Sequence, residues 1–446
     1  MNICGSIFSI KNKGIHKVIT FLGFKFKVKS QKLVNRELKK EITILENYVA
    51  VQDNYQKVLK RLKEKIKTEK IKVIFLTNEP QKWTYDSLYR EFEKSPYFEP
   101  LVVVVPRYNV HLGIDTTRMS LEEQFNFYNS RKYNVAYGYK NGEYVDLKTF
   151  APDIIFYMQV NEVDGFDNPV QLSETALTSY VTYSSQITDY YKHYTQRFHK
   201  QLFVYFSEDK SIIDLYETYK KHNSANCVSV GYPKLDVYLN NNSDINVNQY
   251  WRSPDKYKII YAPHHTFTKG CAFAFSTFPE NYKFILDLAK KYSDSTTWIF
   301  KPHPLLKYKL LDEKCMSEEE VDKYYQEWIN IGNFYDNGDY FDIFKSSDLM
   351  ITDCASFLTE YLPSKKPLIR MINKNAAELN SYGQKVVSQY YQTHNNDELE
   401  TIFRELVVNK NDYKKEEREK LISEVIDFNQ PSAQKIVTYL LSVLGK

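Results

Sequence analysis

The sequence predicts an α/β protein of two doubly wound domains with an N-terminal helical extension. Three observations support this prediction: a length of 446 residues, continuous apolar runs that alternate with helical patterns, and a polar interruption near the middle of the chain. A chain of this length exceeds the size at which one hydrophobic core stops growing, so two domains are expected. Continuous apolar runs between helices are typical of parallel strands covered on both faces.

Residues 1–70 form the predicted extension, which is basic and largely helical. Residues 1–32 mix short apolar patches with lysines and lack the small-residue cleavage site of a signal peptide. Two interpretations stay open for them: a solvated tail or strand pair at a domain edge, or a segment on an anionic membrane surface. From Leu33 to Lys70 the chain lacks Gly and Pro and repeats apolar residues every three or four positions. This pattern predicts a long amphipathic helix, which could also join two copies of the chain.

The two predicted domains cover residues 71–240 and residues 255–425. Between them, a cluster of Asn, Asp, Ser and Pro from Leu239 to Tyr257 predicts a linker. A C-terminal helix is expected over residues 426–446. The predicted strands are Ile71–Thr77, Leu101–Val105 and Pro152–Met158 in the first domain, and Tyr257–Pro263, Ser295–Pro304, Ser347–Asp353 and Lys366–Ile372 in the second.

Composition excludes several classes of protein. The net charge of +4 is too small to indicate a nucleic-acid partner. Five cysteines lie far apart without metal-type spacing, which favours reduced thiols in the cytosol over a disulfide framework. No apolar run approaches the roughly 20 residues that span a bilayer. The sequence also lacks G-x-G-x-x-G and P-loop motifs, which argues against dehydrogenase and kinase activities.

Polar side chains follow three successive strands of the predicted second domain. Ligands of open parallel sheets bind just beyond the carboxyl ends of the strands, so these residues should converge. Each taken alone has a simpler explanation, because a histidine at a strand end usually packs and a Ser or Thr at a helix start usually caps. Their convergence predicts a functional site made of His264, His265, Ser276 and Thr277 after the first strand, Lys301 and His303 after the second, and Asp353, Ser356, Thr359 and Glu360 after the third.

The segment Ile299–Leu306 reads IFKPHPLL, in which Lys301 and His303 each precede a proline. Proline fixes φ and disfavours helical geometry in the residue before it, so both side chains are held at the strand tip. Lys301 supplies a point charge, and His303 supplies a donor that can protonate a leaving oxygen. Beside a helix N-terminus, this pair suits a diphosphate whose bond is being broken. We therefore expect Lys301, His303 and His264 to be catalytic and the remaining residues to bind the donor.

The segments YAPHHT, FKPHP and SDLMITDCASFLTEYLPSKKP resemble the three motifs of the CDP-glycerol glycerophosphotransferase family, the teichoic-acid and capsule polymerases of bacteria. The likeness covers roughly Tyr257 to Met371. It implies a GT-B fold of two Rossmann-like domains, in which His303 contacts the donor diphosphate, Ser356 binds phosphate and Glu360 contacts donor hydroxyls.

Two departures from the family pattern affect these expectations. Ala355 precedes Ser356 where the family usually has a second serine, so one phosphate contact is missing or replaced by a backbone N–H. The family's Trp-His-Gly segment, whose histidine is proposed as the acceptor base, is also absent. The corresponding stretch, Leu177–Ile187, contains no histidine, whereas His193 and His199 follow nearby. The acceptor base therefore stays unidentified, and a glycosyl group could replace glycerol phosphate on the same scaffold.

The leading hypothesis is a transferase that needs neither metal nor cofactor and uses a nucleotide-diphosphate donor. No H-E-x-x-H spacing and no D-x-D in a strand-end loop stand in the sequence. The acceptor would be a polysaccharide, a polyol phosphate or a lipid-linked chain, and the protein would be cytoplasmic, peripheral on the inner face of the membrane. Two alternatives are a sugar-nucleotide epimerase or hydrolase of the same fold, and a non-catalytic scaffold in polymer assembly.

Overall fold

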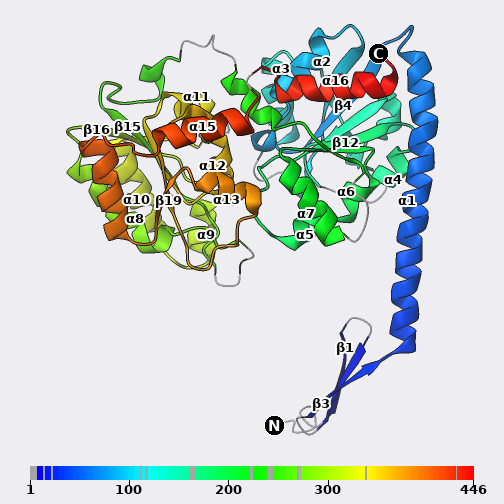
Figure 1. Ribbon diagram of the computed structural model, residues 1–446, viewed down its shortest axis with the longest axis horizontal. Coiled ribbons are helices and arrows are strands. Elements are labelled where there is room, and N and C mark those ends of the chain that lie inside the picture. The colour runs from blue at the N-terminus through cyan, green and yellow to red at the C-terminus, as the bar shows by residue number, and fades with distance from the viewer. Residues whose placement is uncertain are drawn as a thin grey trace.

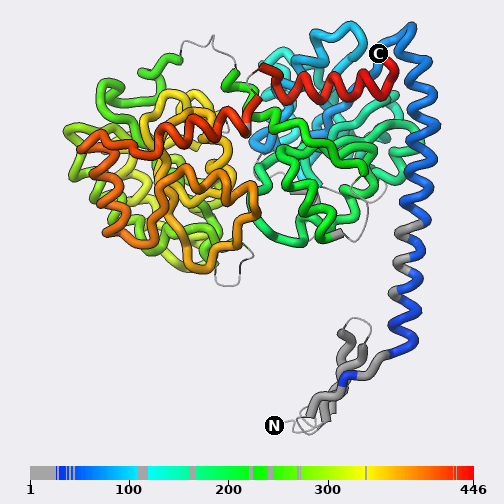
Figure 2. Tube along the Cα trace, viewed as in Figure 1, coloured from blue at the N-terminus to red at the C-terminus, as the bar shows by residue number. Residues whose placement is uncertain are grey.

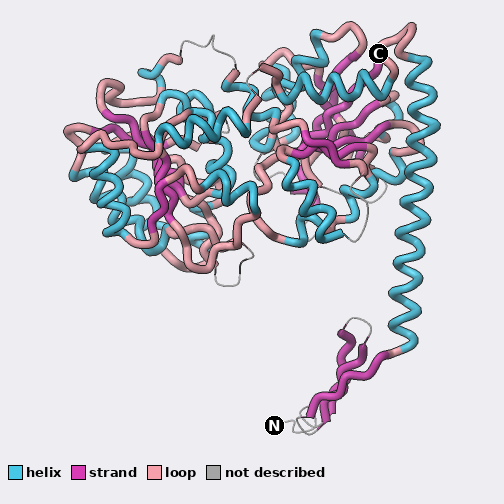
Figure 3. Tube along the Cα trace, in the orientation of Figure 1, coloured by secondary structure: helices cyan, strands magenta, loops and turns pink. Residues whose placement is uncertain are grey.

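The computed structural model places two α/β domains side by side, with a long helix along the outer side of the first (Figure 1). In each domain, helices lie on both faces of a central sheet (Figure 3). The structure describes residues 8–13, 16–21, 24–109, 113–115, 119–160, 166–220, 225–239, 245–268, 271, 273–336, 339–427 and 429–446.

A seven-stranded parallel sheet forms the centre of the first domain. Its order is β14-β13-β12-β11-β4-β5-β8. The strands are β4 Ile71–Thr77, β5 Phe98–Val104, β8 Val135–Tyr137, β11 Ile154–Tyr157, β12 Leu177–Val181, β13 Val204–Ser207 and β14 Cys227–Ser229. The helices around them are α2 Asp86–Lys94, α3 Leu121–Ser130, α4 Pro169–Leu172, α5 Tyr191–Tyr194, α6 Arg197–Gln201 and α7 Lys210–Lys220, and two short hairpins, β6–β7 (Arg107–Asn109, Gly113–Asp115) and β9–β10 (Tyr139–Lys140, Glu143–Tyr144), complete it.

A six-stranded parallel sheet forms the centre of the second domain, in the order β17-β16-β15-β18-β19-β20. Its strands are β15 Tyr257–Ala262, β16 Thr296–Phe300, β17 Asn333–Phe334, β18 Leu349–Thr352, β19 Leu368–Met371 and β20 Tyr391–Thr393. Its helices are α8 Phe278–Lys291, α9 Leu306–Asp312, α10 Glu318–Ile331, α11 Phe341–Ser346, α12 Ala355–Glu360, α13 Ser381–Val387, α14 Asn396–Phe403 and α15 Lys415–Val425.

Both sheets confirm the predicted pair of doubly wound domains. In each, the strand order reverses once, between β4 and β11 in the first sheet and between β15 and β18 in the second. Such a reversal leaves a crevice at the carboxyl ends of the two central strands, which is where ligands of this architecture bind. The apolar runs form these strands because both of their faces are covered; all five residues of β16 are buried.

The two domains meet along a short backbone contact. Thr188 and Leu379 form an antiparallel bridge, and the N–H of Asn380 donates to the carbonyl of Ile187 at 2.9 Å. At Gly383 a Cβ would lie 2.3 Å from the Ile187 carbonyl oxygen, so only glycine permits this close approach. The contact fixes the loop after β12 against the second domain.

The N-terminal extension has two parts. Strands β1 Phe8–Lys13, β2 His16–Phe21 and β3 Phe24–Lys29 form an antiparallel sheet of their own, and helix α1 spans Gln31–Lys65. Helix α1 packs on the first domain through buried residues such as Val51 and Leu62, whereas Leu38, Ile42 and Val49, nearer its start, are about half exposed. Among the described residues, no helix combines the length and apolarity that crossing a bilayer requires.

The chain returns to the first domain at its end, as the red segment shows in Figure 2. Helix α16, Ser432–Leu444, packs on α2 and buries Ile436 and Leu440 there. Its first turn is capped from outside the helix, because the carboxylate of Asp236 accepts the N–H groups of Ser432 and Ala433, each at 2.9 Å. These N–H groups would otherwise be unsatisfied, so the cap stabilises the return of the chain.

Replacing Asp236 with Ala should lower the free energy of unfolding by about 2 kcal/mol, because two N–H groups at the start of α16, one buried and one part-buried, lose a charged acceptor. Chemical denaturation at neutral pH measures this change. Asp255, which is exposed, provides the control, and Asp255→Ala should change stability by less than about 0.5 kcal/mol. Equal stability of the two variants would contradict the capping role.

Candidate functional site

Three imidazoles gather at the reversal point of the second sheet. His264 and His265 directly follow β15, and His303 follows β16. Their ring centroids are 4.4 Å apart for His264 and His265, 3.9 Å for His265 and His303, and 5.0 Å for His264 and His303. The structure therefore brings together all three histidines that the sequence predicted for this site.

Backbone hydrogen bonds set which ring nitrogen of two of these histidines carries the proton. The N–H of Leu305 donates to Nδ1 of His303 at 3.1 Å, and the N–H of Thr266 donates to Nδ1 of His264 at 3.3 Å. An accepting Nδ1 leaves the proton on Nε2 of the neutral ring. Burial lowers the pKa of His264 to about 3, with a further contribution from His265, so His264 is neutral at physiological pH. The Nε2–H groups of His264 and His303 are thus hydrogen-bond donors that an anion can use.

The proline-flanked segment after β16 is held at both ends, as its sequence predicts. The N–H of Lys301 donates to the Tyr261 carbonyl at 2.8 Å, and that of His303 donates to the Pro263 carbonyl at 3.0 Å. The chain therefore continues parallel to β15 for two residues beyond the strand end. This register sets His303 beside His265.

Lys301 is buried within a set of aromatic rings. Its Nζ lies 4.7 Å from the Tyr340 ring centroid, 5.6 Å from that of Tyr335 and 5.7 Å from that of Phe357. Burial lowers the pKa of Lys301 to about 8, partly offset by the charge of Glu360. A cation held in so little water interacts strongly with any anion that reaches it.

Asp353, the residue after β18, holds the loop that carries His264 in place. Its carboxylate accepts the N–H of His264 at 2.6 Å, the N–H of Thr277 at 2.6 Å and the hydroxyl of Thr277 at 2.9 Å. Burial raises the pKa of Asp353 to about 6, although these hydrogen bonds lower it. Asp353 therefore links the loop after β15 to the start of α8, and its two oxygens are used within the protein.

Three further predicted residues also serve the scaffold. Ser276 is fully buried and its hydroxyl accepts the N–H of Phe278 at the start of α8. Thr277 is bonded to Asp353, and the hydroxyl of Thr359 donates to the Ser356 carbonyl within α12 at 3.0 Å. Ser356 differs, because it is half-buried in the first turn of α12, where its hydroxyl contacts the thiol of Cys354 at 3.5 Å. Ser356 thus stays a candidate phosphate contact.

Glu360 connects the two domains. Its carboxylate accepts the Nζ of Lys234, from the first domain, at 3.0 Å and is also hydrogen-bonded by the hydroxyl of Tyr340. The hydroxyl of Tyr238 donates to the Glu360 backbone carbonyl at 2.9 Å. Contact with donor hydroxyls remains a prediction for Glu360. Lys234 was missed, because pairing over 126 residues leaves no local signal in the sequence. Tyr340, which stands 20 residues before Glu360, was missed as well.

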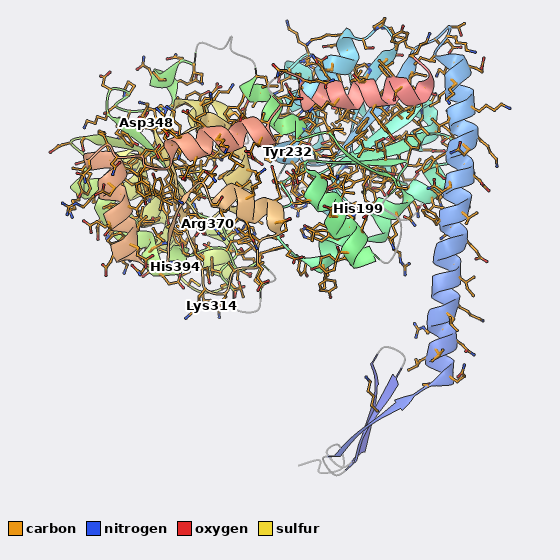
Figure 4. The ribbon with its side chains drawn as sticks, in the orientation of Figure 1. His199, Tyr232, Lys314, Asp348, Arg370 and His394 are labelled. Carbon is orange, nitrogen blue, oxygen red and sulfur yellow. The ribbon has the colours of Figure 1, made fainter. Side chains whose placement is uncertain are left out.

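The first domain contains two histidines and a glutamate that bear on the missing acceptor base. His193 is half-buried, and its ring centroid lies 5.4 Å from that of Phe273. Burial lowers the pKa of His193. His199 lies inside the first domain (Figure 4), where its Nδ1 meets the hydroxyl of Tyr216 at 3.2 Å. Glu208, which follows β13 and was also missed, accepts the N–H of Gln186 in the stretch where the family's histidine is absent. Burial raises the pKa of Glu208 to about 8.

The three-imidazole cluster is also compatible with a metal ion. One ligand nitrogen from each of His264, His265 and His303 lies within 4.8 Å of the others, the only such group found among the described residues. Neutral imidazole is a common ligand of zinc and other transition metals. The expectation of a metal-free site thus remains a prediction that needs a direct test.

Comparisons with known proteins give a matching family and solved structures of similar fold. The sequence model of the family described as "CDP-Glycerol:Poly(glycerophosphate) glycerophosphotransferase" matches residues 183–441, more than half of the chain. A comparison with curated proteins gives no match. The wall teichoic acid polymerase TagF, in a structure soaked with CDPG, is 12% identical over 91% of this chain and 97% of its own, with a TM-score of 0.56. UDP-GlcNAc 2-epimerase from Neisseria meningitidis, bound to UDP-GlcNAc, is 13% identical over 84% of this chain and 100% of its own, with a TM-score of 0.55.

Replacing Glu208 with Gln should change how stability depends on pH. The folded state raises the pKa of Glu208 from 4.5 to about 8, so its contribution to stability is complete below pH 4.5 and is lost as pH rises through about 8. Gln carries no charge, so the variant should gain stability over the wild type across this window, by on the order of 2 kcal/mol at its upper end. Denaturation at several pH values measures the difference. Glu143→Gln, at an exposed position, should give a profile parallel to the wild type, and a parallel profile for Glu208→Gln would contradict the assigned cause.

Proposed function

We infer that this chain, which belongs to the CDP-glycerol:poly(glycerophosphate) glycerophosphotransferase family, is a nucleotide-dependent transferase of cell-surface polymer synthesis. The proposed donor is CDP-glycerol or a related nucleotide-activated compound, and the proposed acceptor is a polysaccharide, polyol phosphate or lipid-linked chain. The observation that carries this proposal is the cluster of three imidazoles at the reversal point of the second sheet, with the buried ammonium of Lys301 two residues before His303. A diphosphate is the ligand that this set of donors suits.

The proposed reaction is an in-line displacement. An acceptor hydroxyl attacks the phosphorus that bears the glycerol, the bond between that phosphorus and the bridging oxygen breaks, and the nucleoside monophosphate leaves with the bond's electron pair. His303, His264 and Lys301 stabilise the negative charge that grows on the departing phosphate. The proton of the acceptor hydroxyl passes to a base or to solvent. Transfer of a glycosyl unit would use the same three residues to stabilise the departing phosphate.

We also propose that His265 and Ser356 contact the donor phosphates and that the reaction needs neither a metal nor an organic cofactor. Asp353, Ser276, Thr277 and Thr359 support the site, because their polar groups are used within the protein. The structural likeness to epimerases is a likeness of fold alone at 13% identity, so an epimerase activity has no observation of its own in its favour.

A peripheral membrane location is proposed from the N-terminal extension. Residues 1–36 contain eight Lys and Arg and no Asp or Glu. The register of β1–β3 assigns seven apolar residues, together with Asn12 and Lys17, to one face, and five of the lysines to the opposite face, all in the two edge strands. An apolar face flanked by cations suits an anionic bilayer surface, because long lysine stems reach past a sheet edge to the headgroups. The apolar residues are Phe8, Ile10, Ile19, Phe21, Phe24, Phe26 and Val28, and the lysines are Lys11, Lys13, Lys25, Lys27 and Lys29.

His303→Ala should lower turnover by roughly 10²- to 10⁴-fold, because a donor to the leaving phosphate is lost. Release of nucleoside monophosphate from CDP-glycerol, in chelator and with a defined acceptor, measures this loss. A thermal-shift series of CDP-, UDP-, GDP- and CMP-linked compounds first identifies the donor that binds. His394→Ala, at an exposed position of the same domain, is the control and should retain full activity. Near-normal turnover by folded His303→Ala would refute the assigned role, and loss of wild-type activity in chelator would refute the metal-free reaction.

The full-length chain should sediment with phosphatidylglycerol vesicles at low salt and release from them at high salt. Ile19→Asn with Phe26→Asn, at paired positions on the apolar face, should abolish this binding. Ile42→Ser, on the exposed face of α1, should leave lipid binding unchanged. If Ile42→Ser instead converts a dimer to a monomer, and vesicles bind no variant, the extension joins two chains rather than a chain and a membrane.

A further inference from the structure

Arg370 is a buried cation that the imidazole site does not use. It lies in β19 of the second domain (Figure 4), between Thr352 of β18 and Gln392 of β20. Side chains alternate along a strand, so Arg370 shares the face of Leu368, which belongs to the same hydrophobic cluster as Val386 of α13. The guanidinium is therefore on the side of the sheet that α13 covers.

The charge of Arg370 has no counter-ion within ion-pair distance in the part of the chain that the structure describes. The residue is 9% exposed, and its side chain donates one hydrogen bond there, from Nη1 to the neutral amide oxygen of Gln392 at 3.3 Å. Burial lowers the pKa of Arg370, and the charge of Asp353 offsets this only in part. Arginine stays charged in proteins, and a buried charge is normally paired. An anion from outside the chain is therefore expected beside it.

Arg370 lines a cavity of about 530 Å³ at the carboxyl ends of β19 and β20. This volume is in the range of small-molecule sites. Lys374 brings a second cation and Glu378 one anion, and both are exposed. The lining of the cavity thus carries a net positive charge, which favours an anionic ligand.

The cavity lies next to the imidazole site but is separate from it. None of its lining residues belongs to that site. The two are adjacent because the amide of Asn373, in the loop after β19, donates to the carbonyl of Ser276 at 2.6 Å. The N–H of Ala377 in the same loop donates to the carbonyl of Phe273 at 3.0 Å.

Neutral polar side chains line the cavity around the guanidinium. They are the amides of Asn373, Gln384 and Gln392 and the hydroxyl of Ser388. A guanidinium binds phosphate through two parallel N–H bonds, and a second cation matches the second charge of a phosphomonoester. Amides and hydroxyls pair with hydroxyl groups, which both donate and accept. This combination suits a phosphate attached to a small polyol.

We propose that this cavity binds a small phosphorylated polyol, with Arg370 holding the phosphate and the surrounding amides holding the hydroxyl groups. The ligand occupies a place of its own in the second domain, so it can be present together with the nucleotide donor. The proposal goes beyond the transferase function and does not depend on it.

Isothermal titration calorimetry with glycerol 3-phosphate, a simple phosphorylated polyol, tests this site in the full chain. All titrations use the His303→Ala chain, because the imidazoles can also attract phosphate. Glycerol 3-phosphate should bind this chain, inorganic phosphate should bind more weakly, and glycerol should not bind. Adding Arg370→Gln should lower the affinity for glycerol 3-phosphate at least about tenfold, because charge-assisted hydrogen bonds are lost.

Arg404→Gln is the matched control, because it makes the same chemical change at an exposed position of the same domain and should leave the affinity unchanged. Thermal unfolding provides a second measurement. Gln removes a buried charge that lacks a counter-ion, so Arg370→Gln should be at least as stable as the parent chain.

Three results would overturn the proposal. The first is absence of glycerol 3-phosphate binding, or equal binding with and without Arg370→Gln. The second is a loss of stability in Arg370→Gln, which would show that the guanidinium serves the fold. The third is equal affinity for glycerol 3-phosphate and inorganic phosphate, which would overturn the recognition of hydroxyl groups.

Discussion

A single buried carboxylate fixes the arrangement on which the donor site depends. Asp353 accepts hydrogen bonds from His264 and Thr277, which belong to the two ends of one loop, while it stands at the end of the neighbouring strand β18. A buried carboxylate is costly unless such donors surround it, so the loop and the strand end require each other. The imidazoles after β15 and β16 are positioned because this support, and the backbone bonds of Lys301 and His303, leave them little freedom.

The two domains are joined close to the residues of the imidazole site. Lys234 of the first domain pairs with Glu360 of the second, which is also hydrogen-bonded by the hydroxyl of Tyr340, whose ring lies over Lys301. The glycine at position 383 allows the loop after β12 to press against the second domain, and Figure 4 labels Tyr232 where the two domains meet. Contacts from both domains therefore fix the surroundings of the site.

The sequence predicts the fold well because both sheets consist of fully buried strands. Runs such as Ile71–Thr77 must be covered on both faces, and that leaves few architectures. The donor site was predictable for a related reason, since strand-end residues converge by topology. The role of each residue within it was less predictable: Thr359 bonds inside its own helix, and the Ser276 hydroxyl accepts the N–H of Phe278 at the start of α8. Lys234 gave no sequence signal, because its importance comes from a partner that only the folded chain defines.

The engagement of Glu360 by Lys234 has a consequence for relative movement of the two domains. The ion pair joins a side chain of the first domain to helix α12 of the second, and both partners are largely shielded from water. Removing one partner from such a pair leaves an uncompensated charge, so the domains cannot separate at this point without a substantial cost in free energy. Opening of the interface therefore has to hinge elsewhere or supply Glu360 with another cation.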